Sequence, residues 1–273
     1  MKTKFFSAFT ILLVIGATLS IAFIAYMASN DKIYSTMEYI DSKYLDSRFS
    51  AYYKDTSNAN GNPSPNTRIP NAVAGNQPIQ EPLTYFKITE VPRINQHPEL
   101  PTGCEVTSAA IALNYLGINV SKIDLANTIV KSPLPANGVG SHPNEAFIGS
   151  PYDKNGYGVF HSPVFNLMRG YTDKVQDVTG ISFEDLLSHI AAGHPAIVWT
   201  TTNLDEFEYT DTWSVNDIPF TWPGNEHTSV LIGYSSNQVI VNDPYTGLEK
   251  TFDKATFKAR FEALGHQAII VIK

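Results

Sequence analysis

The chain has 273 residues, of which 43% are hydrophobic, and its 19 Lys and Arg against 26 Asp and Glu give a formal net charge of -7. This composition is typical of a globular domain with a hydrophobic core, and the acidic balance argues against a nucleic acid partner, which needs a basic surface. The single cysteine, Cys104, excludes an intramolecular disulfide framework and any thiolate-rich zinc or iron–sulfur site. No ligand cluster with metal-binding spacing stands out, so we expect neither a metal nor a cofactor.

The N-terminal segment, residues 1–30, is predicted to be a membrane anchor. Residues 5–27 carry no charge and as a helix would span roughly 34 Å, which is enough to cross a bilayer. Lys2 and Lys4 precede this run, so the positive-inside rule places the rest of the chain outside the cytoplasm. A cleaved signal peptide, which would give a secreted protein, stays open as the alternative, although the run is longer than usual and lacks a good cleavage site.

Residues 31–82 are predicted to connect this anchor to the folded domain. Residues 31–53 place apolar side chains near helical spacing, which indicates a juxtamembrane helix. Residues 54–81 are rich in Asn, Pro, Ser and Gly and nearly free of large apolar residues, a composition that favours a flexible linker. The folded domain is therefore predicted to cover residues 83–273.

Helices come first in this domain. An apolar stripe predicts a helix over residues 104–116, and Thr102 and Glu105 match the T-x-x-E pattern of a capping box at its start. A second, shorter helix follows Ser121, which repeats the capping pattern. Residues 132–157 are full of Gly, Pro and Asn and are predicted to form a loop.

Strands dominate the second half of the domain. After the loop we expect helices over residues 163–168, 183–192 and 254–264, and strands over residues 196–200, 228–234, 238–242, 249–252 and 267–272. Leading helices followed by neighbouring strands indicate an α+β fold, with an N-terminal helical part packed on a C-terminal antiparallel sheet.

Cys104 falls in the first turn of the first predicted helix. Unpaired backbone N–H groups and the positive end of the helix dipole stabilise a thiolate at this position, so a reactive nucleophile is one interpretation. The other is a buried cysteine that only fills space beside Pro101. The helix position alone leaves both open.

A thiol nucleophile needs a base, and His227 is the best candidate among the seven histidines. The others lie in loops or near helix ends without an orienting partner and are read as solvated or capping residues. His227 begins a predicted strand, and the return strand ends at Asp243. Pairing the two strands about a turn near Ser236 makes His227 and Asp243 neighbours, so the carboxylate can orient the imidazole.

Acyl transfer also needs donors for an oxyanion, commonly the N–H of the nucleophile and one side-chain amide. Gln96 lies eight residues before Cys104 and could supply that amide, although an ordinary loop glutamine explains it as well.

Together these residues resemble a known family. Gln96, the run Leu-Pro-Thr-Gly-Cys104-Glu-Val-Thr-Ser, the run Glu-His227-Thr-Ser-Val-Leu-Ile-Gly-Tyr and the run Val-Asn-Asp243-Pro-Tyr are similar to the motifs of stand-alone peptidases related to family thirty-nine of the cysteine peptidases, the bacteriocin-leader-processing group. The resemblance implies a papain-like fold with Cys104 as nucleophile, His227 as general base, Asp243 as orienter and Gln96 in the oxyanion hole.

The chain also departs from the bacteriocin processors, which are domains of cytoplasm-facing exporters. It carries no ATPase, and its predicted catalytic domain faces outward, so their substrate does not carry over. We expect residues 132–157 and the aromatic residues Trp213, Phe220 and Trp222 to shape a different cleft, with packing a better account of Phe220 than of Trp222.

The predicted function is therefore a bacterial, extracytoplasmic thiol peptidase that cleaves amide bonds through a Cys104 thioester. An acyl transferase of the transpeptidase kind would use the same residues, and a non-catalytic module that binds peptides or cell-wall fragments is a further alternative. Expected partners are a peptide, protein or cell-wall peptide substrate and the membrane.

Overall fold

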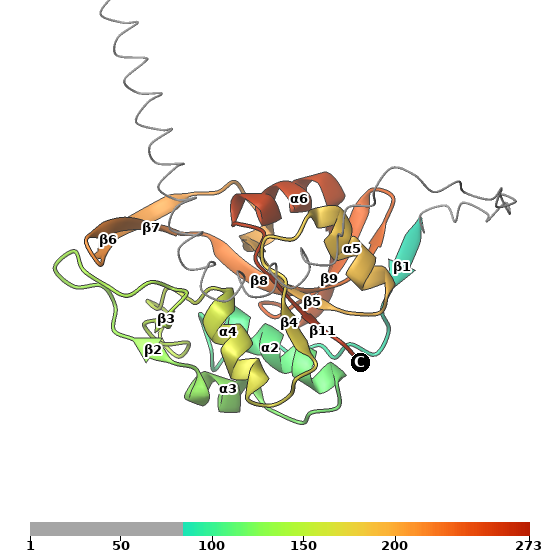
Figure 1. Cartoon of the computed structure of the whole chain (residues 1–273), viewed down its shortest axis with the longest axis horizontal. Coiled ribbons are helices and arrows are strands. Elements are labelled where there is room, and N and C mark those ends of the chain that lie inside the picture. Colours follow the sequence, from blue (N-terminus) through green and yellow to red (C-terminus); the bar gives the residue numbers. More distant parts are fainter. Residues whose placement is uncertain (1–83) are drawn as a thin grey trace, which may run out of the picture. The chain divides into compact units, whose positions relative to one another are not determined.

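The computed structural model describes residues 84–273 (Figure 1). The predicted anchor, juxtamembrane helix and flexible linker lie outside the described residues and stay predictions, as does the domain start at residue 83. Within residues 84–273, no helix is both long and apolar enough to cross a membrane.

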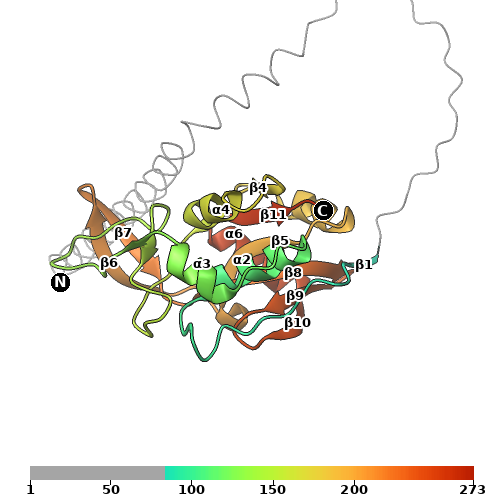
Figure 2. The same ribbon diagram turned by 90° about the horizontal axis from the view of Figure 1, so that it is seen from below.

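A seven-stranded sheet forms the centre of the domain, and its neighbouring strands pair antiparallel. The order is β10-β9-β8-β5-β11-β4, which Figure 2 shows from bottom to top, and β1 pairs with the far end of β8. The strands are β1 (Tyr85–Lys87), β4 (Val175–Asp177), β5 (Ala196–Thr201), β8 (Glu226–Ser235), β9 (Gln238–Asp243), β10 (Leu248–Asp253) and β11 (Ala268–Val271).

Helices cover both faces of this sheet (Figure 1). On one side lie α2 (Cys104–Tyr115), α3 (Lys122–Thr128) and α4 (His161–Arg169), and on the other lie α5 (Phe183–Ala191) and α6 (Lys254–Ala263). Accordingly β5 and β11 are buried at every residue, as expected for strands with both faces covered. The predicted antiparallel sheet in a mixed α/β domain is confirmed, and α5 and α6 stand between strands along the chain, as predicted for residues 183–192 and 254–264.

The start of α2 differs from the predicted capping box. Gly103 is the N-cap residue and makes no side-chain cap bond. A Cβ at Gly103 would lie 2.6 Å from Leu100 Cβ, so only glycine fits there. The Thr102 hydroxyl donates to the backbone oxygens of Ser150 and Asp153, and Glu105 is fully buried instead of reaching back to the cap. Contacts of Thr102 and Glu105 with distant parts of the chain replace the capping bonds that the T-x-x-E pattern predicts.

The predicted cap at Ser121 is confirmed, and two further helices begin with caps of the same local kind. Ser121 and Asp124 form a capping box at α3, and the side chains of Ser182 and Asp253 accept backbone hydrogen bonds at the starts of α5 and α6. These caps depend only on residues within one helical turn, which explains why the sequence suffices to find them.

Residues 132–157 and a hairpin beside them form a second, smaller core (Figure 1). The hairpin consists of β6 (Tyr209–Val215) and β7 (Ile218–Pro223), neither of which was predicted. Two short parallel strands flank the irregular loop, β2 (Lys131–Ser132) and β3 (Phe147–Ile148). Trp213 and Trp222 are 2% and 3% exposed, so both pack in this core. Phe220 is half-buried and packs against this core, so packing accounts for Phe220 as expected, and it accounts for the buried Trp222 as well.

Candidate active site

Cys104 is the first residue of α2, and its side chain is buried. The thiol donates a hydrogen bond to Glu105 Oε2 over 3.3 Å, and the sulfur lies against the Thr228 backbone at the start of β8. Burial raises the pKa of the thiol well above its ordinary value, and the charges of Glu105 and Glu226 raise it further, against a smaller lowering by the Thr228 backbone. The helix start was expected to favour a thiolate, but in this structure burial and the acidic neighbours favour the thiol.

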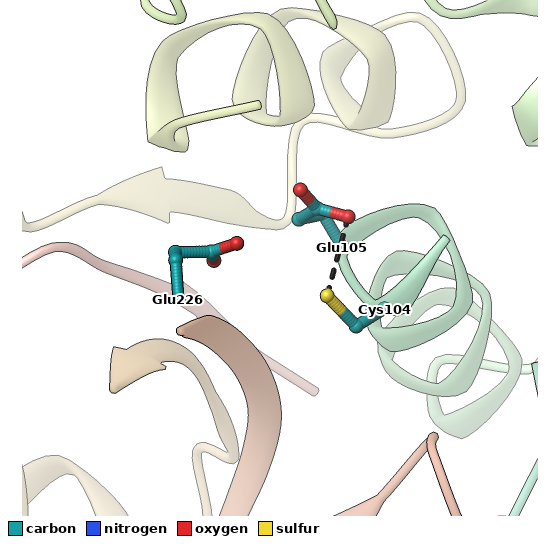
Figure 3. Close-up of side chains that lie close together, drawn as sticks. All are labelled: Cys104, Glu105 and Glu226. Atoms are coloured by element: carbon teal, nitrogen blue, oxygen red, sulfur yellow. Dashed lines mark hydrogen bonds between the residues drawn. The ribbon is translucent and has the colours of Figure 1, made fainter. Parts of the chain in front are cut away.

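Glu105 and Glu226 face each other beside the sulfur (Figure 3). Glu105 Oε1 accepts a hydrogen bond from the Val159 backbone N–H over 2.7 Å, and burial raises the pKa of Glu105 to about 7. Glu226 Oε1 accepts from the Thr228 hydroxyl over 3.1 Å. Burial, and then the charge of Glu105, raise the pKa of Glu226 well above its ordinary value. The nucleophile candidate therefore borders two weakly acidic carboxyl groups.

One atom each of Cys104, Glu105 and Glu226 lies within 4.8 Å of the other two, and these three form the one such group of His, Cys, Asp and Glu among residues 84–273. The distances alone would suit a metal ion. However, burial raises the pKa of the thiol and of both carboxyls, which disfavours the deprotonated forms that bind a metal. We therefore interpret the cluster as an acid pair beside a thiol.

His227 and Asp243 lie together, as the predicted strand pairing requires. His227 Nε2 and Asp243 Oδ1 are 2.8 Å apart. The register of β8 and β9 pairs Tyr234 with Val239 and Val230 with Asn242, which brings the two distant ends together. The other ring nitrogen of His227, Nδ1, has no hydrogen-bond partner within the described part of the chain, so it is free to take a proton.

Asp243 is held by several donors. Its Oδ1 also accepts from the Tyr245 backbone N–H, and its Oδ2 accepts from the Thr246 hydroxyl over 2.9 Å and pairs with Lys250 Nζ over 2.7 Å. Burial raises the pKa of Asp243, but the hydrogen bond and charge of His227 and the bonds from Lys250 and Thr246 outweigh it and hold the pKa well below its ordinary value. Asp243 is therefore held as a carboxylate beside the His227 ring.

No hydrogen bond joins Cys104 to His227 in the described residues. They are nevertheless close along the framework, because Thr228, whose backbone contacts the sulfur, follows His227 directly. Side chains alternate along a strand, so Glu226 and Thr228 point towards α2 while His227 points to the side that holds Asp243. The structure therefore places His227 beside Asp243. It places Cys104 beside the start of β8, the strand that carries His227.

Gln96 is 2% exposed and lies in the segment that leads to α2. Its Nε2 donates to the Pro101 backbone oxygen over 3.1 Å, and its buried Oε1 has no partner among residues 84–273. The backbone N–H of Gln96 donates to Pro244, the residue after Asp243. Gln96 therefore lies near both halves of the site, but its amide is engaged with the chain and makes no hydrogen bond to Cys104.

A second histidine–carboxylate pair was missed from the sequence. His161 Nδ1 lies 2.5 Å from Asp177 Oδ2, and both residues are largely buried, so reading His161 as a solvated or capping residue is wrong. Asp177 comes from the short strand β4, which carries too weak an alternating pattern to be predicted. This pair fastens the start of α4 to the sheet edge.

The two carboxyl groups beside Cys104 were also missed as functional residues. A signal for Glu105 was present, since it is the one charged residue between Cys104 and Tyr115 in an otherwise apolar and small-residue helix. The capping-box interpretation already accounted for Glu105, so no other role was predicted for it. Glu226 stands directly before His227, and nothing in its immediate sequence distinguishes it from an exposed strand-end glutamate.

Comparisons with known proteins give a consistent result. Residues 88–269 match the family described as the Peptidase_C39 like family. The uncharacterized protein YvpB of Bacillus subtilis (strain 168) is 35% identical over 178 residues, which cover 64% of this chain and 71% of YvpB. A crystal structure from Bacillus anthracis, described as that of a C39-like peptidase, superposes with a TM-score of 0.66 at 37% identity and covers 69% of this chain and 98% of that one. The range covered by the family match contains Cys104, His227 and Asp243.

Proposed function

Since the chain belongs to the Peptidase_C39-like family, we propose that it is a cysteine peptidase of papain-like fold that hydrolyses amide bonds through a thioester on Cys104. The observation that carries this proposal is the start of β8. It presents His227, oriented by Asp243 at 2.8 Å, next to the residue whose backbone touches the Cys104 sulfur. A nucleophile at a helix start, a histidine and an orienting carboxylate are the parts that thiol peptidases need.

In the proposed reaction the His227 ring turns to the Cys104 side of β8, its Nδ1 takes the thiol proton, and the sulfur attacks the carbonyl carbon of the substrate. The amine then leaves with that proton, and the acyl group stays on Cys104 as a thioester. Water, deprotonated by His227, releases the acid and restores the thiol. Asp243 stabilises the imidazolium at both proton transfers, because it is held as a carboxylate throughout.

The proposed oxyanion site combines the Cys104 backbone N–H with the Gln96 amide. Gln96 keeps one Nε2 proton beyond its bond to Pro101, and the loop that bears it ends at Cys104. This supports a role for Gln96 that needs only a small movement of its side chain.

The proposed location is the outer face of a membrane, with residues 1–30 as the anchor. The support is the uncharged run over residues 5–27 behind Lys2 and Lys4. Added protease should cut the linker over residues 54–81 in intact cells. Cleavage only from the cytoplasmic side would contradict the proposed orientation.

Alkylation tests the chemistry without knowledge of the substrate. Iodoacetamide should modify Cys104 of the full-length chain, and His227→Ala should slow the reaction at neutral pH by at least tenfold because the thiol loses its base. Cys104→Ser provides the unlabelled control. A rate that does not respond to His227→Ala would contradict the proposed function. Profiling with a peptide library would then identify the bond that is cleaved.

A further inference from the structure

The carboxyl groups of Glu105 and Glu226 have no part in the reaction described above. We propose that they are positioning residues that share a proton beside Cys104 and control the pH range over which its thiolate forms. The inference rests on the proposed role of Cys104 as nucleophile and adds a second layer of control to it. Neither carboxyl needs to touch the substrate.

The close approach of the two carboxyls is built into the fold. A Cβ at Gly158 would lie 2.5 Å from Glu105 Oε1 and 3.3 Å from Glu226 Oε2, so both oxygens converge on this glycine. Gly158 has φ +145°, a conformation that other residues rarely adopt. Trp222 closes the third side at 3.2 Å from the same point. Residue 158 therefore has no side chain, and the two carboxyl groups occupy the space that a side chain would fill.

Nothing on the surrounding elements neutralises this pair. Cys104 from α2 is the titratable group beside both carboxyls, whereas His227, next to Glu226 on β8, points to the other side of the strand, where Asp243 engages its Nε2. From the start of α4, His161 is engaged by Asp177, and β7 contributes the apolar Trp222. In the described residues neither Glu105 nor Glu226 has a salt bridge to Lys or Arg. Two carboxylates this close, with little water and no cation, retain a proton between them.

The protonation state of the Glu105–Glu226 pair determines the charge next to the Cys104 sulfur. When both carboxyls are protonated, the pair is neutral and Glu105 can donate a hydrogen bond to a Cys104 thiolate. When Glu105 ionises, near pH 7, its Oε2 becomes a negative acceptor 3.3 Å from the sulfur and opposes the thiolate. Ionisation of Glu105 therefore raises the apparent pKa of the thiol, so the thiolate fraction grows less steeply above about pH 7 than it does in an isolated cysteine.

The test is the alkylation rate of Cys104 in the full-length chain, measured from pH 5.5 to pH 9 with iodoacetamide. The double variant Glu105→Gln plus Glu226→Gln keeps the shapes but removes both charges. It should react at nearly the wild-type rate at pH 5.5 and about tenfold faster at pH 8, because one negative charge beside the thiol shifts its pKa by about one unit or more. Glu184→Gln, an exposed glutamate on α5, is the matched control and should follow the wild type.

A merely structural role would change the rate equally at every pH, so a constant ratio between the double variant and the wild type would overturn the inference. Under that outcome the proposed function still stands, provided that His227→Ala slows alkylation in the same assay. If the double variant does not fold, infrared spectra of the wild type and the single variant Glu226→Gln provide the second measurement. The wild type should show a protonated carboxyl band at pH 6 that weakens in the variant, and an unchanged band would contradict the shared proton.

Discussion

Two carboxylate sites lie at the start of β8, and burial affects them in opposite ways. Asp243 is 3% exposed, yet its pKa is held low, because burial is outweighed by His227 and Lys250. Glu105 is fully buried and Glu226 lies next to it, and their pKa values are raised, because burial is joined by repulsion between the two acids. A neighbouring cation therefore has more influence than the depth of burial on whether a buried carboxyl is charged.

The largest change in reaction rate is expected for substitution of Asp243, the charged carboxylate of the two sites. Asp243→Asn should lower the rate of Cys104 alkylation, and of peptide hydrolysis, by about 100- to 1,000-fold, because the amide neither fixes the His227 tautomer nor stabilises the imidazolium. Lys250→Met is the matched control, since it removes the other ion pair of Asp243 and leaves His227 in place. Its effect should stay below about tenfold. Equal losses in both variants would mean that Asp243 acts through the fold and not through His227.

The pH dependence of stability should separate the two sites by sign. The folded pKa of Glu105, about 7, exceeds its unfolded value, so this residue contributes stability at low pH that is lost as the pH rises from about 4.5 to 7, by up to roughly 3 kcal/mol. Asp243 has a folded pKa below its unfolded value, so its contribution is present above about pH 4 and is lost on acidification.

Urea unfolding at pH 3, 5 and 8 would measure both contributions. The double variant Glu105→Gln plus Glu226→Gln should remove most of the fall between pH 5 and pH 8 and leave the loss at pH 3. Conversely, Asp243→Asn should weaken only the acid limb. A wild-type stability that rises from pH 5 to pH 8 would contradict the assignment of an uncompensated acid pair.

The smallest expected effect sharpens the geometry of the acid pair. Gly158→Ala should destabilise the fold by about 1–3 kcal/mol, because its Cβ would meet Glu105 Oε1 and the backbone φ is unfavourable. Gly170→Ala, at the end of α4 where φ is -66°, should change stability by less than about 1 kcal/mol. Thermal denaturation of both variants makes the comparison, and equal melting temperatures would mean that the two acids have more room than the structure indicates.

The sequence was sufficient for the half of the site that depends on strand pairing. Two mainly apolar runs, residues 228–234 and 238–242, with a polar turn between them, determine which ends meet, so His227 and Asp243 could be placed together. Likewise, the apolar run after Cys104 sufficed for α2, whose observed start agrees with the predicted one. Both inferences use periods and turns that lie within about twenty residues.

The acid pair could not be predicted for the opposite reason. Glu105 meets Gly158 and Val159, which follow it by more than fifty residues, across a loop without regular structure. The local T-x-x-E pattern offered a satisfactory explanation for Glu105 and concealed the tertiary one. The hairpin of β6 and β7 was missed because β6 is largely polar and exposed, and because β7 contains two prolines, Pro219 and Pro223, which argue against a strand.

The segment that leads to the nucleophile has a mechanical consequence. Residues 85–87 pair with β8, Asn242 at the end of β9 holds the backbone oxygens of Val91 and Pro92, and the Gln96 N–H is held by Pro244. These attachments follow one another along the chain before Cys104 is reached. A pulling force applied at Thr84 would therefore load β1 first and the two later attachments in turn. Cys104 therefore follows three successive attachments along the chain. These attachments would carry a force applied on the N-terminal side before it reached Cys104.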